Sequence, residues 1–224
     1  MRIAFYPQKK IIIFSMKDIL IFRNDFVSLL KISVILYVFK NIYLKEMNFK
    51  TKLSKRVGMT VIHEITFLTQ DSNQRKRELY NLLFDKDDLV AYQAAWTLTH
   101  FTVTDNEWLF DKQNELIDEV LVCQHPGKRR LILSVILRQP LNNPPRMDFL
   151  DFCLERMMSK KELPAVQTLS MKLAYEMCRN FPELKQEFSV LLDMMEPDLL
   201  EISMRTARKN VLNAMKKEKS LQTY

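Results

Sequence analysis

The chain has 224 residues, and only two of them, Gly58 and Gly127, are glycine. Phosphate-binding loops of the P-loop and Rossmann types need several glycines close together, so both classes are excluded. The net charge of +7 comes mostly from residues 1–46, which contain 8 Lys/Arg and 3 Asp/Glu, whereas the other residues contain 26 and 24. The body of the protein is therefore nearly neutral, and the charge of the whole chain is no signal of nucleic-acid binding.

Residues 1–46 form an atypical N-terminal segment, rich in Ile, Phe, Tyr, Lys and Asn. No small-residue cleavage site of a signal peptide follows its apolar runs, and four charged residues, Asp18, Arg23, Asp25 and Lys31, interrupt the runs. Three interpretations stay open: an over-extended gene start with translation beginning at Met47, a membrane-surface or weakly spanning helix, or an ordered part of the fold. A membrane partner is expected only if this segment is genuine.

Beyond the N-terminal segment, apolar residues recur with a helical period, which predicts a helix over about 49–68 and four helix pairs after it. The predicted pairs are 72–84 with 86–101, 105–122 with 126–138, 145–158 with 161–179, and 182–195 with 197–217. The second helices begin about 35 to 40 residues apart, a step typical of helical-repeat solenoids. We therefore expect a repeat domain over 47–217, followed by a polar tail over 218–224.

The helix starts are predicted from caps and prolines. Three sequences have the capping-box spacing, and they are DSNQ (71–74), TDNE (104–107) and SKKE (159–162). Three prolines suit a first helical turn, where a missing N–H is tolerated, and they are Pro145, Pro182 and Pro197.

The first and second helices of the pairs differ in their apolar pattern. The first helices are apolar on one face, which is typical of an outer layer. The second helices are apolar on two faces, as in LVAYQAAWTLTHF (89–101), so they are expected to form an inner layer that is covered on both sides. In this stretch Trp96 is predicted to pack in the core, with Gln93 or Thr97 at the surface.

Three segments carry a family resemblance: DDLVAYQAAWTLTHF, ELPAVQTLSMKLAYEM with FPELKQEF after it, and SMRTARKNVLNAMKK. Over roughly residues 70–217 the chain resembles a group of short bacterial HEAT-like (ARM-type) repeat proteins of unassigned function. The resemblance implies an all-α, right-handed α-α superhelix of about four HEAT-like helix pairs, and it implies no chemistry. The chain lacks the regular Asp and Arg that standard HEAT repeats have at repeat junctions.

Adenylosuccinate lyase, an activity sometimes attributed to this group, is not supported by the sequence. That enzyme family is much longer and has a loop with Met-Pro, Lys-x-Asn-Pro and a catalytic serine. The nearest fragment, LNNPPR (141–146), has neither the serine nor the lysine.

The residues that usually carry chemistry are scattered along the chain. His63, His100 and His125 lie on three different predicted elements, and HEITF lacks the second histidine of a zinc-binding helix. The three cysteines, Cys123, Cys153 and Cys178, are expected to be buried free thiols, which fits a reducing cytoplasm. No catalytic residue, metal site, cofactor or small-molecule substrate is predicted.

The predicted outer and inner helices differ in the sign of their charged residues. The outer helix 105–122 has six acids and one lysine, whereas the inner helix 126–138 has four Lys/Arg and no acid. Solenoids bind along the concave surface that inner helices line. The predicted contact residues are Gln93, Lys128, Arg129, Arg130, Gln167, Lys172, Arg205 and Arg208.

Two functions follow from this pattern. The leading hypothesis is a non-enzymatic scaffold whose concave surface binds a protein partner, with an acidic partner as one option. The alternative is nucleic-acid binding in the style of HEAT-like DNA-repair glycosylases. The basic residues of the inner helices would form the contact surface, but the inner helix of the third predicted pair also carries the acids Glu162 and Glu176.

Overall fold

A computed structural model describes residue 34 and residues 47–222. The chain divides into two units, residues 1–47 and 48–224, one residue from the predicted domain boundary. Apart from residue 34, the predictions for the N-terminal segment fall outside the described residues. Within the described residues, no helix is long and apolar enough to cross a membrane.

The described residues form helices and no β-strand. In chain order the elements are α3 (Phe49–Leu53), α4 (Met59–Thr69), α5 (Asn73–Asn81), η1 (Leu82–Phe84), α6 (Asp88–Leu98), α7 (Val103–Glu107), η2 (Phe110–Lys112), α8 (Gln113–Val122), α9 (Pro126–Leu137), α10 (Met147–Met158), α11 (Pro164–Cys178), α12 (Pro182–Asp193), η3 (Pro197–Leu199) and α13 (Ile202–Lys217).

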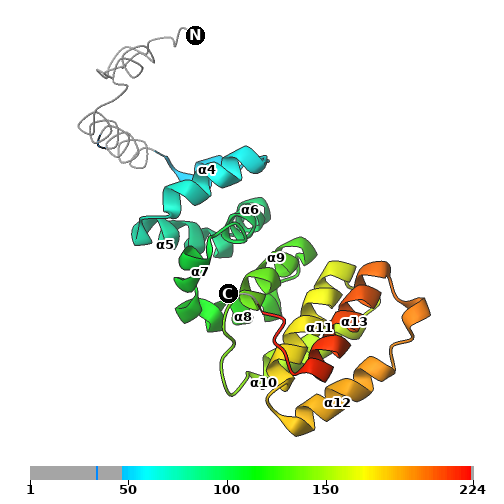
Figure 1. The fold of residues 1–224 in the computed structure, drawn as a ribbon. Helices are drawn as coiled ribbons and strands as arrows, with labels where there is room; N and C mark the ends of the chain where they lie inside the picture. Colours follow the sequence, from blue (N-terminus) through cyan, green and yellow to red (C-terminus); the bar gives the residue numbers. More distant parts are fainter. Residues whose placement is uncertain (1–33, 35–46, 223–224) are drawn as a thin grey trace, which may run out of the picture. The chain divides into compact units, whose positions relative to one another are not determined.

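The helices of residues 48–224 are arranged in two layers. In the inner layer α6 packs on α9, α9 on α11 and α11 on α13, and α4 packs on α6 at the N-terminal end. The outer helices α5, α8 and α10 pack on α6, α9 and α11 respectively, and α12 also packs on α11 (Figure 1). This stack of helix pairs confirms the predicted all-α superhelical repeat fold.

Three predicted helices are interrupted. The predicted helix 49–68 is two helices, α3 and α4, separated by residues 54–58. The predicted helix 105–122 tightens after α7 into i→i+3 hydrogen bonds, such as that from the Leu109 amide to the Asn106 carbonyl, before α8 begins. The last helix starts at Ile202, because Pro197 begins a separate 3₁₀ turn.

The caps explain where several helices begin. The cap of α5 is Ser72, one residue after the predicted position, and it accepts a hydrogen bond from the Arg75 amide. The cap of α7 is Thr102, two residues before the predicted position. The sequence SKKE caps no helix, since α11 begins at Pro164. Pro182 opens α12 as expected, whereas Pro145 precedes α10, which begins at Met147.

Candidate binding surface

The side of α6 that other helices leave uncovered carries large side chains. Leu89 is exposed, and Tyr92, Trp96 and His100 are half-buried along the same face. Trp96, which was predicted to pack in the core, is therefore only partly buried. Ala94 and Ala95, next to it, are buried and let the neighbouring helices approach closely.

Gln93 and Thr97, predicted at the surface of α6, are both buried. The Gln93 side chain accepts a hydrogen bond from the Val57 amide (2.8 Å) and donates to the carbonyls of Leu53 (2.6 Å) and Lys55 (2.9 Å). These backbone groups lie at the end of α3 and in the turn before α4, where they have no partner within a helix. Gln93 therefore holds that turn and is not available to a partner.

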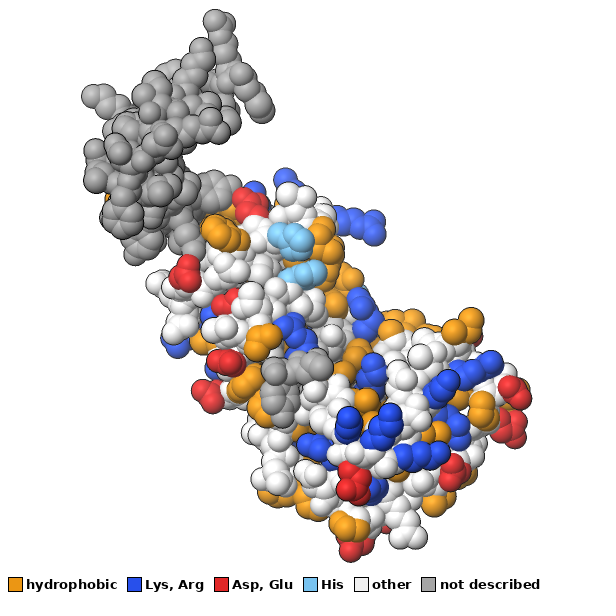
Figure 2. All heavy atoms as spheres, in the orientation of Figure 1, with side chains coloured by type: hydrophobic (Ala, Val, Ile, Leu, Met, Phe, Trp, Pro, Cys, Tyr) orange, Lys and Arg blue, Asp and Glu red, His pale blue; other side chains and the backbone are white. Residues whose placement is uncertain are grey.

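Aromatic rings and histidines from three elements meet beside α6. The His100 ring lies 5.3 Å from that of His63 on α4 and 6.3 Å from that of Trp96, measured between centroids. Tyr92 lies 5.4 Å from His125, whose Nδ1 accepts from the Lys128 amide and caps α9. Together these residues form an aromatic cluster at the N-terminal end of the inner layer, where Figure 2 shows two histidines.

The backbone of α9 comes close to this cluster because Gly127 has no side chain. A Cβ atom there would lie 3.0 Å from both the Tyr92 and the His125 rings, which is tighter than ordinary van der Waals contact. Burial lowers the pKa of His100, and the neighbouring His63 and Arg138 lower it further. The His100 ring is therefore neutral near neutral pH.

Two predicted contact residues on α9 are buried and neutralised. Lys128 Nζ lies 2.7 Å from Glu119 Oε1 on α8. Arg129 forms an ion pair with Glu162, in the turn before α11, and donates to the Cys123 carbonyl (2.6 Å). Both side chains are only 9% exposed, so the prediction that they face a partner is wrong. A buried cation needs such partners to offset the loss of hydration.

Three more predicted contacts satisfy carbonyls where elements end. The Gln167 amide donates to the Ser159 carbonyl (2.7 Å). Arg205 donates to the Pro197 carbonyl (2.9 Å) in η3, and Arg208 donates to the Leu192 carbonyl (2.8 Å) in α12. Each of these carbonyls also accepts from the backbone amide three residues further along, so the side chains add a second donor and already serve the fold. Arg138, which was not predicted as a contact, also donates to backbone carbonyls, those of Thr99 and Phe101 after α6.

Arg130 and Lys172 are the two predicted contact residues whose side chains have no hydrogen bond or ion pair with another described residue. Both are half-buried, on the stacked helices α9 and α11, and no carboxylate of a described residue lies within 4.0 Å of either. Ser134 and Leu169 share their helix faces. We call the uncovered faces of α6, α9 and α11 the inner surface. It consists of Leu89, Tyr92, Trp96, His100, Arg130, Ser134, Leu169 and Lys172.

The comparison with known families agrees with this layered geometry. The family model for the HEAT repeat domain matches residues 49–215. The chain belongs to the HEAT repeat family. HEAT repeats commonly act as protein-interaction scaffolds, and the match brings no catalytic family with it. No curated protein and no solved structure matches the chain.

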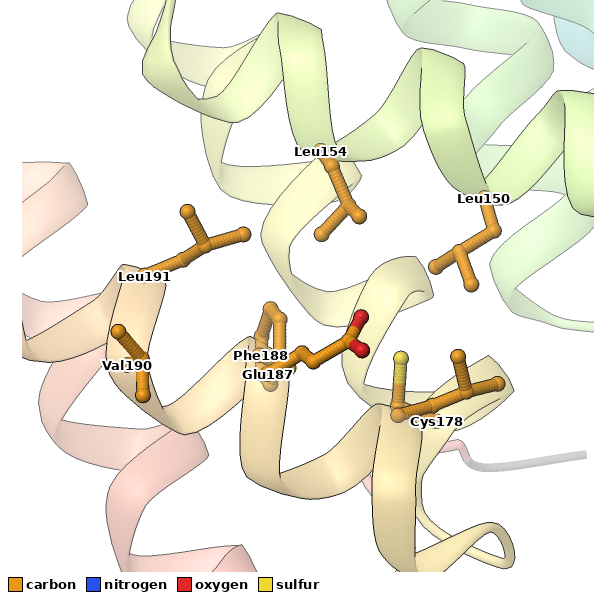
Figure 3. A pocket seen from close by; sticks show the side chains of 8 residues that line it. Leu150, Leu154, Cys178, Glu187, Phe188, Val190 and Leu191 are labelled. Atoms are coloured by element: carbon orange, nitrogen blue, oxygen red, sulfur yellow. The ribbon is translucent and has the colours of Figure 1, made fainter.

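The outer layer of this HEAT repeat protein has an open apolar groove between α10 and α12 (Figure 3). Its volume is about 310 Å³, and Leu150, Leu154, Phe188 and Leu191 line it. Glu187 is the single ionisable carboxylate of the lining. The groove is thus a gap between two amphipathic helices, without the convergent polar groups of a small-molecule site.

Cys178 also lines the groove, and burial together with Glu187 raises the pKa of its thiol to about 12. All three cysteines are buried free thiols, as predicted. A thiol with such a raised pKa is protonated and unreactive at neutral pH. Among the described residues, no group of three or more His, Cys, Asp or Glu side chains is arranged to hold a metal ion.

Proposed function

We propose that this HEAT repeat protein is a non-catalytic binding module that presents its inner surface to a protein partner. The observation that carries the proposal is the contrast between the cations of the inner layer. Lys128 and Arg129 are paired with carboxylates, whereas Arg130 and Lys172 have no carboxylate partner among the described residues and lie on the uncovered side. On the uncovered faces of α9 and α11, these two cations are thus left for a carboxylate supplied by another molecule.

The composition of the inner surface favours a protein over other ligands. Tyr, Trp and Arg are enriched at the centres of protein interfaces, because they bury a large area and also offer polar groups. Trp96 and Tyr92 provide the rings, and Arg130 can bind a carboxylate through two N–H groups. The partner surface that fits best combines apolar side chains with Asp or Glu.

Nucleic-acid binding is less well supported, because it needs a run of free cations along the phosphate backbone. Of the eight predicted contact residues, Gln93 and Gln167 are neutral, and Lys128 and Arg129 are neutralised by acids. On α9 and α11, Arg130 and Lys172 are too few for a groove that follows DNA, and the exposed lysines Lys209, Lys216 and Lys217 lie on α13, outside the inner surface. The buried free thiols further support a reducing compartment such as the cytoplasm.

Affinity capture with the full chain tests the proposal. We expect a partner to bind the wild-type chain and to be lost when Arg130→Glu and Lys172→Glu are combined, because carboxylates would then face carboxylates. The matched control combines Lys86→Glu with Lys160→Glu, two exposed lysines in loops, and should retain the partner.

Equal binding by both double variants would contradict the assignment of the inner surface. Binding of duplex DNA that weakens steeply with salt, and that is lost in the Arg130/Lys172 variant, would instead establish the nucleic-acid function.

A further inference from the structure

The polar segment after α13 does not leave the domain. Glu218 has φ 52° and ψ 37°, in the left-handed region, and it ends α13. The Lys219 amide donates back to the Ala214 carbonyl (3.0 Å), which closes the helix end. Residues 219–222 then run back from α13 toward the end of α9 (Figure 1).

The segment is held first by α11. Tyr175 donates its hydroxyl to the Lys219 carbonyl (2.7 Å). Glu176 accepts two hydrogen bonds, one from the Ser220 hydroxyl (3.0 Å) and one from the Leu221 amide. Two of these three contacts use the backbone of the segment, and the third uses the Ser220 hydroxyl.

The Glu176 carboxylate is buried where it can accept hydrogen bonds from the polar segment. Its side chain is 1% exposed, and it forms an ion pair with Arg179, the residue after α11, whose Nε lies 3.0 Å from Glu176 Oε2. A buried carboxylate with a single cation still has lone pairs to satisfy. The Ser220 hydroxyl and the Leu221 amide supply these hydrogen bonds, so α11 has an acceptor site for one hydroxyl side chain and one backbone amide of a peptide segment.

The second half of the site lies at the end of α9. The Gln222 side-chain amide donates to the carbonyls of Leu137 (3.1 Å) and Gln139 (2.5 Å). Carbonyls at a helix C-terminus have no partner inside the helix and accept such donors readily. A polar pocket of about 90 Å³, lined in part by Asn142, Asn180 and Gln222, adjoins this point.

We propose that the C-terminal ends of α9 and α11 form a binding site for a non-helical peptide segment, which residues 219–222 of the chain occupy themselves. The segment recognised has a hydroxyl side chain two residues before a carboxamide side chain, as in Ser220-Leu221-Gln222. The ligand class is therefore a polypeptide carrying a Ser/Thr-x-Gln/Asn sequence.

The position of the site connects it with the inner surface. Tyr175 and Glu176 lie about one helical turn beyond Lys172, and Leu137 lies one turn beyond Ser134. A partner segment that extends along the inner surface would reach the residues that the polar segment covers. In this respect the inference rests on the proposed function, because the partner that binds the inner surface would displace residues 219–222.

A tethered segment competes strongly with a free one. Its effective concentration is on the order of millimolar for a short linker. A free peptide with the same sequence should therefore bind poorly to the intact chain and well to a chain whose own segment is removed or weakened.

The test uses a fluorescent peptide with the sequence of residues 218–224, EKSLQTY, titrated against three chains by fluorescence anisotropy. The chains are the wild type, a variant that ends at Lys217, and a full-length variant with Ser220→Ala and Gln222→Ala. We expect the two variants to bind the peptide at least about tenfold more tightly than the wild type does. A peptide with the same two alanine substitutions should bind none of the chains.

The full-length variant keeps the test decisive if the shortened chain does not fold, which circular dichroism would reveal. Absence of peptide binding to a folded variant would overturn the inference and leave the segment a structural brace. The proposed function is tested separately, because Arg130→Glu with Lys172→Glu should abolish partner capture while peptide binding to the Ser220/Gln222 variant persists.

Discussion

Arg129 on α9 and Glu162, in the turn before α11, form an ion pair that is buried between two consecutive repeats. The pair is 33 residues apart in sequence, so it connects neighbouring repeats rather than residues of one helix. Arg130, the next residue, lies about 100° further around the same helix, where it is half-buried and has no described carboxylate within 4.0 Å. Two adjacent arginines therefore have different roles, one in the fold and one at the surface.

We expect Arg129→Gln to destabilise the protein by about 3–5 kcal/mol, because Glu162 would be left buried without its main cation. Arg130→Gln is the matched control and should change the free energy of unfolding by about 0.5 kcal/mol or less. Urea denaturation followed by circular dichroism measures both variants. Equal losses for the two substitutions would refute the division of roles.

Trp96→Ala should cost about 2 kcal/mol, less than a fully buried tryptophan would, because solvent already reaches part of the ring. Leu98→Ala, on the buried side of the same helix, should cost about 2–5 kcal/mol. The midpoints of denaturant unfolding compare the two. A larger loss at Trp96 than at Leu98 would show that the ring packs in the core after all.

The stability of the protein should depend on pH through His100. Its pKa in the folded chain is below the ordinary value of 6.5, because burial, His63 and Arg138 disfavour the charged ring. The unfolded chain then binds a proton more readily, so this contribution to stability is complete above pH 6.5 and is lost as pH falls through the folded pKa.

The measurement is the melting temperature between pH 8 and pH 5 for the wild type and for His100→Asn. The variant lacks the titrating ring and should lose less stability over this interval. Parallel curves for the two chains would mean that His100 titrates alike in the folded and unfolded states.

The sequence predicts the layers of this protein well, because helical period, prolines and N-caps are local signals. Asp87, near which a second helix was predicted to start, does cap α6 by accepting hydrogen bonds from the Leu89 and Val90 amides. The early end of α3 is harder to predict. It depends on Gln93, about 40 residues further along, which satisfies the backbone of the turn.

The binding surface is less predictable, because the same residue type serves different purposes at neighbouring positions. Nothing local distinguishes Arg129 from Arg130, and the difference arises from Glu162 in the next repeat. The polar segment also gave no signal of packing, since its contacts with Tyr175 and Glu176 span about 45 residues. Long-range partners of polar groups determine which side chains stay free, and a helical period carries no information about them.

Amide hydrogen exchange of the full chain, with and without a captured partner, tests most directly whether the inner surface binds a protein. We predict that the partner slows exchange in residues 89–100, 126–134 and 165–172, the uncovered inner helices, while α10 and α12 exchange as before. Slowed exchange confined to α10 and α12, with none on the inner helices, would contradict the claim.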